Sequence, residues 1–209
     1  MDASLATIKE AIGRKADVLF VHHGLFWGNS QVITGRHYER ISTMIRNNLA
    51  LFACHLPLDA HLTYGNNAQM AKKLNLQDIE PFAKFRGVYV GVKGRFPVPM
   101  TAEEITARLG VRVNDTNFAL NCKGKKFGSV GIVSGGGAGD VYTAMDEDLD
   151  LLITGESRYS TINDCLEDDM SMLCLGHYET ETFGVRAMMD MVGSTLGLET
   201  SIIDIPLGL

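Results

Sequence analysis

The chain of 209 residues has few cysteines, a single tryptophan and no excess of positive charge. Its four cysteines form no C-x-x-C pair, so we expect reduced structural thiols rather than a disulfide framework. A net charge of −6 argues against a nucleic-acid partner held through its phosphates. The apolar runs are short, and the acidic, amphipathic N-terminus does not resemble a secretory signal. We therefore expect a cytoplasmic protein without a membrane partner.

What the chain does contain is an alternation of helical and strand-like patterns. Apolar residues at helical spacing predict helices over 4–15, 37–49, 66–76 and 179–196. Short apolar runs predict strands over 17–23, 49–55, 87–96, 171–177 and 200–205. Residues 126–157 are typical of a strand, a glycine-rich turn, a helix and another strand. This alternation predicts an α/β fold.

A second α/β unit is predicted to begin near Pro97. There, Thr101 and Glu104 have the spacing of a helix capping box, and Gly110 follows as a C-cap. No linker rich in proline, serine or charge is present, so we expect two closely packed units. Residues 1–95 are assigned to the first unit, completed by 175–209, and residues 96–174 to the second.

Three of the predicted strands end in histidines, whose ring nitrogens are costly to bury without partners. One strand ends in His22 and His23, another in His55, and a third in His177. In open α/β sheets the ligand site lies beyond the carboxyl ends of the strands. If these strands share one sheet, their rings lie close to three residues that follow them: Asp59, His61 and Glu181.

The spacing of these residues predicts a metal site. His177 and Glu181 are four residues apart, so on a helix they lie on one face and could hold one ion. Asp59 follows Pro57 in what we expect to be a non-helical turn, from which its carboxylate can point back over the strand ends. The paired rings of the first strand can reach the same pocket if the chain bends at Gly24.

Imidazoles together with carboxylates suit Zn, Fe, Mn, Ni or Co better than Ca or Mg. Their number exceeds what a closed tetrahedral site uses, so we predict two divalent transition-metal ions. The predicted ligands are His22, His23, Asp59, His177 and Glu181. His55 and His61 could be ligands or could orient ligands. His37 has charged neighbours at the start of a helix and is expected to be a surface residue.

Three further features have two interpretations each. The glycine run 134–139 follows a strand and precedes a helix, so it could cradle a phosphate or form a tight turn. Glu156 could face the cleft as a base or an orienting acid, or could be solvated while Ser157 caps a helix. Trp27 could be a partly buried wall or a subunit contact.

The segments VHHGLFW, HLPLDAHLTYGNNAQMAKKL, SGGGAGD, ITGE and GHYETETFGVRAM together resemble the NIF-three-like dinuclear-metal family. Its members are often labelled GTP cyclohydrolase 1 type 2 homologues. The resemblance covers nearly the whole chain. It implies two α/β units with the metal site at their interface, the same five metal ligands, and a toroidal homohexamer built as a trimer of dimers. Family members usually carry a further segment before DASLATI, so the first unit is short by comparison.

We expect a metal-dependent hydrolase that acts on a small molecule, which could be a nucleotide. GTP ring opening is what the family label implies, and the pattern singles out no catalytic residue. An alternative from another class is a non-enzymatic metal-binding chaperone or scaffold whose ions are cargo or structural. Nucleic acid threaded through a toroid would need a basic lumen, which the net charge of −6 disfavours.

Overall fold

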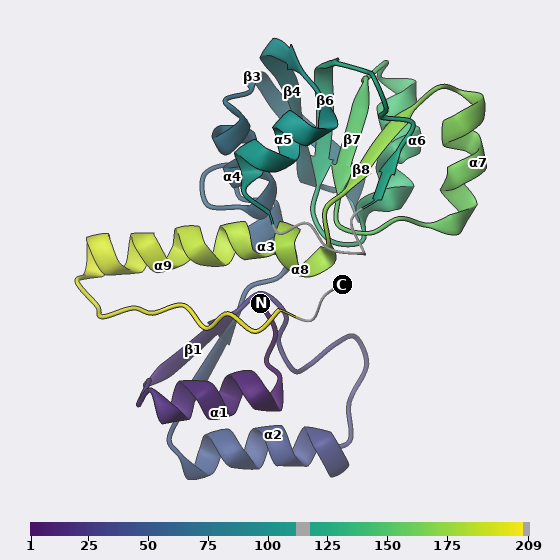
Figure 1. Ribbon diagram of the computed structural model, residues 1–209. Coiled ribbons are helices and arrows are strands. Elements are labelled where there is room, and N and C mark those ends of the chain that lie inside the picture. The colour runs from purple at the N-terminus through teal and green to yellow at the C-terminus, as the bar shows by residue number, and fades with distance from the viewer. Residues whose placement is uncertain (112–117, 207–209) are drawn as a thin grey trace. The chain divides into compact units, whose positions relative to one another are not determined.

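The computed structural model describes residues 1–111 and 118–206, which form two compact units (Figure 1). The first unit comprises Met1–His55 and Met188–Ile205, and the second comprises Leu56–Ala187 and Pro206. The sequence pattern predicts a change of unit near residue 95. The structure instead divides the chain after His55 and again inside the long C-terminal helix. The α/β class predicted from the alternation is confirmed.

The first unit is built on a parallel two-stranded sheet (Figure 1). Its elements are α1 (Leu5–Gly13), β1 (Val18–Val21), α2 (Gly35–Arg46) and β2 (Ala50–Ala53). The two strands are paired so that Val21 lies opposite Ala53. Parallel pairing brings the carboxyl ends of both strands to the same edge, which is where the histidines follow.

Helices cover one face of this small sheet. Ile8 of α1, Leu19 of β1 and Met44 of α2 belong to one buried apolar cluster. On the other face, the rings of Phe20 and Phe52 stack with their centroids 5.6 Å apart. The alternation of side chains along a strand explains why Leu19 and Phe20 point to opposite faces.

The second unit holds a mixed sheet of six strands in the order β3-β4-β6-β7-β8-β5. Strands β6, β7 and β8 are parallel, and the outer strands pair antiparallel with their neighbours. The strands are β3 (Gln77–Phe85), β4 (Val88–Met100), β5 (Phe118–Leu120), β6 (Phe127–Val133), β7 (Leu151–Thr154) and β8 (Ser171–Cys174). The helices are α3 (Leu56–Asp59), α4 (Asn66–Leu74), α5 (Ala102–Leu109), η1 (Gly137–Asp140), α6 (Val141–Asp146), α7 (Tyr159–Glu167) and α8 (His177–Thr180). Helix α9 (Thr182–Leu196) begins in this unit and ends in the first.

Helices cover both faces of the six-stranded sheet. Residues of α4 and α5 share an apolar cluster with Leu151 and Ile153 of β7. Residues of α6 and α7 share another cluster with Leu152, which lies between those two in the sequence. A strand that is buried on both faces reads as a continuous apolar run, as the sequence LLIT does.

The predicted capping box is confirmed. The Thr101 hydroxyl accepts a hydrogen bond from the Glu104 N–H, and the Glu104 carboxylate accepts one from the Thr101 N–H. Helix α5 ends at Gly110, whose φ of 65° lies in the left-handed region. These bonds satisfy backbone groups that the helix itself cannot pair, so local sequence alone fixes both ends of α5.

The closing strand predicted over 200–205 is wrong, because these residues have no regular secondary structure. Their β-branched residues favour a strand, but no backbone ladder to a neighbouring strand forms there. The Arg14 guanidinium donates a hydrogen bond of 2.8 Å to the Ile202 carbonyl instead. In the described part of the chain, no helix combines the length and apolar character that crossing a bilayer would require.

Candidate metal centre

Three histidine rings gather at the carboxyl edge of the β1–β2 sheet. His22 and His23 follow β1 directly, and His55 follows β2 after Cys54. The ring centroids of His22 lie 4.9 Å from those of both His23 and His55, and the centroids of His23 and His55 lie 5.1 Å apart. One ring nitrogen from each histidine lies within 4.8 Å of the others. The prediction that strand ends bring histidines together is confirmed within this unit.

Gly24 lets the chain pass close to the neighbouring strand after the paired histidines. A Cβ atom at this position would lie 2.8 Å from the Cβ of Ala53. The backbone N–H groups of His22 and His23 both donate to the Met1 carbonyl, at 2.9 and 3.0 Å. These contacts hold both rings at the strand edge, as the expected bend requires.

The first two histidines each bind an oxygen atom through Nδ1. His22 is fully buried, and its Nδ1 lies 2.9 Å from the Cys54 carbonyl oxygen. The Nδ1 of His23 lies 2.8 Å from a carboxylate oxygen of Asp2. An acceptor at Nδ1 places the ring proton there and fixes Nε2 as the nitrogen that can coordinate a metal.

The second unit supplies the predicted His177–Glu181 pair. Gly176, with a φ of 93°, turns the chain from β8 into the short helix α8, which starts at His177. The Nε2 atom of His177 lies 3.1 Å from Oε2 of Glu181, as four-residue spacing predicts. Two donors bound to one tetrahedral ion at about 2.0–2.1 Å would lie roughly 3.3 Å apart, so this separation suits a shared ion.

Glu156 orients His177. Its Oε1 lies 2.5 Å from Nδ1 of His177. Helix α7 begins at Tyr159 with Arg158 in the N-cap position, so the alternative in which Ser157 caps the helix is wrong. The interpretation of Glu156 as an orienting acid is therefore the one that the structure supports.

The acidic neighbours also change the protonation of His177. The hydrogen bond with Glu181, the largest contribution, and that with Glu156 raise the pKa of His177 from 6.5 to about 9, against an opposing effect of burial. A metal ion binds neutral imidazole, so an ion bound here at neutral pH must displace this proton.

The glycine run packs closely against His177 and Glu181. The N–H of Gly135 donates to the Thr180 hydroxyl at 3.0 Å, and its carbonyl accepts from the N–H groups of Gly155 and Glu156. A Cβ atom at Gly135 would overlap Glu181 Oε1 and would lie 3.0 Å from His177 Nε2. These contacts are those of a tight turn, and they explain why a glycine stands at this position.

Asp59 is held in a buried polar network. Its Oδ1 accepts hydrogen bonds from the Asn66 amide at 2.8 Å and from the Ser134 hydroxyl at 3.2 Å. The side-chain oxygen Oδ1 of Asn66 accepts a hydrogen bond from the Gly184 N–H at 2.7 Å. Because Ser134 adjoins Gly135, consecutive residues of one loop contact Asp59 and Glu181. The expected non-helical turn is wrong, since Asp59 ends the short helix α3.

The sequence interpretation did not assign the two asparagines to the site. Gly65 occupies the N-cap position of α4, and both asparagines are fully buried. The Asn67 side chain bridges the Ser134 N–H, at 2.7 Å, and the Val90 carbonyl, at 2.6 Å. The only sign of this network in the sequence was the pair of consecutive asparagines in a predicted helix. Buried amide side chains need hydrogen-bond partners, so a buried pair indicates a polar network around it.

The two remaining histidines, His61 and His37, have contacts outside this cluster. Nδ1 of His61 accepts the N–H groups of Thr63 and Tyr64, both at 3.1 Å, so it closes a turn after α3. His37 lies in the first turn of α2, and its ring contacts Phe26 at 5.1 Å between centroids. The structure thus groups His55, but not His61, with His22 and His23.

The arrangement of strands differs from the simplest expectation. His22, His23 and His55 belong to the two-stranded sheet of the first unit, whereas β8, which precedes His177, belongs to the six-stranded sheet. The supposition that all three strands share one sheet is therefore wrong. Each unit separately presents imidazole or carboxylate side chains at the carboxyl ends of parallel strands.

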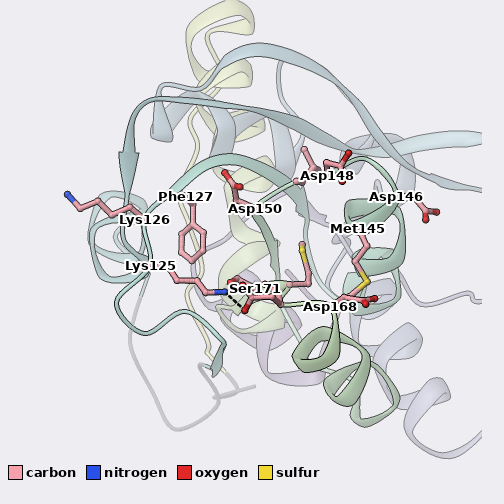
Figure 2. Close-up of a pocket in the computed structure, with 12 residues that line it drawn as sticks. Lys125, Lys126, Phe127, Met145, Asp146, Asp148, Asp150, Asp168 and Ser171 are labelled. Atoms are coloured by element: carbon pink, nitrogen blue, oxygen red, sulfur yellow. Dashed lines mark hydrogen bonds and ion pairs between the residues drawn. The ribbon is translucent and has the colours of Figure 1, made fainter.

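A cavity of about 710 Å³ lies at the opposite, amino ends of β6, β7 and β8 (Figure 2). Two of its acidic side chains have structural partners. Asp150 accepts the N–H groups of Gly128 and Ser129 at 2.8 Å each, and Asp169 pairs with Lys125 at 2.8 Å. These contacts stabilise the start of β6 and the loop before β8, so we assign the cavity no part in the metal centre.

The fold is α/β, and its clustered histidines and carboxylates are side chains that could hold metal ions. The chain belongs to the Duf34/NIF3 (NGG1p interacting factor 3) family, whose model matches residues 1–206. It is 39% identical to the GTP cyclohydrolase 1 type 2 homolog of Deinococcus radiodurans, over all of this chain and 80% of that protein.

Solved structures agree with this assignment. The fold matches that of the protein ybgI with a TM-score of 0.88 and 32% identity, over 100% of this chain and 83% of that one. It also matches TTHA1606 of Thermus thermophilus, with a TM-score of 0.86 and 35% identity over the same shares. The resemblance found in the sequence motifs is therefore confirmed.

Proposed function

We propose that the protein binds two divalent transition-metal ions and uses them to hydrolyse a small molecule. The ions are Fe, Zn, Mn, Ni or Co, and the ligands are His22, His23, Asp59, His177 and Glu181. In this proposal the ligands of both units serve the same pair of ions.

One observation carries the proposal: each of the three predicted histidine ligands binds an oxygen acceptor through Nδ1. The acceptors are the Cys54 carbonyl for His22, Asp2 for His23 and Glu156 for His177. Histidines that ligate metals nearly always have such a partner on the other ring nitrogen, because it fixes the tautomer and the ring orientation. Histidines in a purely structural role have no need for this repeated pattern.

The chain holds its carboxylate ligands as firmly as its histidines. Asp59 and Glu181 are 8% and 4% exposed, and both contact residues of the loop that starts at Ser134. Burying carboxylates is costly unless charges or hydrogen bonds compensate, and a pair of cations would supply that compensation. Imidazole and carboxylate donors together also match the preferences of the proposed metals.

Two bound ions supply Lewis acidity and a water molecule that ionises near neutral pH. The residues of this chain position the ligands, and Glu156, 2.5 Å from Nδ1 of His177, holds the proton on that nitrogen so that Nε2 faces the proposed ions. The relative from Deinococcus radiodurans is named a GTP cyclohydrolase 1 type 2 homolog, which supports a small substrate that could be a nucleotide. We further propose a toroidal homohexamer as the assembly.

Metal analysis of purified variants tests the ligand assignment. We expect about two ions per chain in the natural protein, and a loss of both in either His23→Ala or Glu181→Ala if the two sets of ligands serve the same ions. His61→Asn is the matched control, since asparagine can still accept the N–H groups of that turn, and it should retain both ions. Full metal content in the two ligand variants would refute the proposal.

Turnover and metal exchange separate an enzyme from a carrier. Metal-loaded protein should hydrolyse GTP or a member of a panel of phosphoesters and amides faster than the His23→Ala, Glu181→Ala double variant. If no substrate is turned over and the ions pass readily to a metal-free acceptor, the hydrolase proposal fails and the role of a metal carrier is favoured. The mass of the assembly in solution tests the hexamer.

A further inference from the structure

Trp27, the only tryptophan of the chain, lies against the histidine cluster of the first unit. Its ring centroid is 5.4 Å from that of His23 and 4.8 Å from that of His55. The ring planes meet at 69° and 77°, so both contacts are edge-to-face. The indole therefore borders the position where the proposed ions would bind.

The indole is fixed in place and still exposed. Its Nε1–H donates to the Gly24 carbonyl at 2.9 Å, and the Trp27 carbonyl accepts from the Gln31 amide at 3.1 Å. The only polar atom of the side chain is thus satisfied within the loop, yet 45% of the residue remains accessible to solvent. The indole therefore presents a preorganised aromatic surface to a ligand, and its N–H group is already used in a hydrogen bond within the loop.

We propose that the exposed part of Trp27 stacks on a planar heteroaromatic ring of the substrate. This inference rests on the proposed function, because it concerns the substrate that reaches those ions. A fixed indole gains from contact with a flat π system, and the gain is insensitive to the hydrogen-bonding pattern of that ring. A flexible aliphatic or purely ionic substrate would gain little from the same surface. The substrate class is therefore a nucleobase-like compound.

Binding of three probes to zinc-loaded protein tests the stacking. The probes are guanosine, ribose 5-phosphate and inorganic tripolyphosphate, which separate the ring from the sugar and the phosphates. Guanosine should bind and should quench tryptophan emission, all of which comes from this one residue. Calorimetry measures the same affinity without relying on fluorescence. If guanosine binds no better than ribose 5-phosphate, the proposal is overturned.

Two substitutions of the same residue separate stacking from simple packing. Trp27→Leu should weaken guanosine binding by roughly 5- to 150-fold, the range expected for base–aromatic stacking, whereas Trp27→Phe should weaken it by less than about threefold. Phe26→Leu is the matched control, because the ring of this neighbouring residue contacts His37 and not the histidine cluster that Trp27 contacts. Equal affinities of Trp27→Leu and the natural protein for guanosine would overturn the proposal. It would also be overturned if Trp27→Leu changed the mass of the assembly but not the affinity for guanosine.

Metal content distinguishes this failure from failure of the proposed function. The Trp27 variants should retain the zinc of the natural protein, since Trp27 is not among the proposed ligands. Full zinc content with no preference for guanosine would refute the stacking and leave the metal centre intact. Failure of the natural protein to bind zinc or any other of the proposed metals would refute the proposed function itself.

Discussion

Gly135 is the position where a single added methyl group should disturb the centre most. A Cβ there would overlap Glu181 Oε1 and approach His177 Nε2 at 3.0 Å. Gly135 also has a φ of 63°, where a residue with a side chain is strained. We therefore predict that Gly135→Ala displaces the Glu181 carboxylate and lowers both stability and metal affinity.

The size of the effect follows from these contacts. The left-handed conformation costs alanine roughly 1–2 kcal/mol, and overpacking at a closely packed site costs about 1–3 kcal/mol more. The Glu181 side chain is only 5% exposed, so it has little room to move aside. The expected loss is about 2–5 kcal/mol in the free energy of unfolding, with metal affinity reduced by at least about tenfold.

The next residue provides the control. A Cβ atom at Gly136 would meet nothing within 4 Å, and its φ of −84° is open to any residue. Gly136→Ala should therefore change stability by less than about 0.5 kcal/mol and leave metal affinity unchanged. Urea unfolding in the presence of chelator measures the folding effect alone, and competition with a chromophoric chelator measures metal affinity. Equal behaviour of the two variants would contradict our account of the glycine run.

Three other predictions concern the groups around the centre. In chelator-treated protein, the free energy of unfolding should fall as pH rises from about 6.5 towards about 9. The fold raises the pKa of His177 to about 9, and over this pH range His177 loses the proton that stabilises its pairing with Glu181. Urea unfolding at several pH values measures this slope, which should flatten in Glu181→Gln. Asn66→Ala should lower metal affinity by roughly 10- to 100-fold by releasing the buried carboxylate that it contacts; metal content equal to the natural protein after dialysis would argue against this role. Cys54, the one cysteine that is not buried, should react first with a thiol reagent, because burial raises the pKa of thiols such as Cys174 to about 12; rapid reaction of all four thiols in the folded protein would count against it.

Local features of the sequence predicted much of the secondary structure. The capping box of α5 and the apolar strand LLIT depend on neighbours within a few residues, and both were predicted correctly. By contrast, β3 and β5 were not predicted. They are outer strands of the sheet, and their hydrogen bonds go to β4 and β8. The pattern over 200–205 is equally strand-like, yet these residues have no regular secondary structure, so the local pattern alone does not decide whether a strand forms.

The sequence by itself determined which chemistry the protein can host. Paired histidines after a strand, and a histidine four residues before a glutamate, restrict the choice to a few metal-binding arrangements, because side-chain type and local spacing are set by the chain. Only the tertiary structure decided which other groups orient them. The contacts of His23 with Asp2, Glu156 with His177, and Asn66 with Asp59 span 21, 21 and 7 residues. Hydrogen bonds of this kind form only when the chain folds back on itself, so the spacing of residues along the sequence does not predict which partners meet.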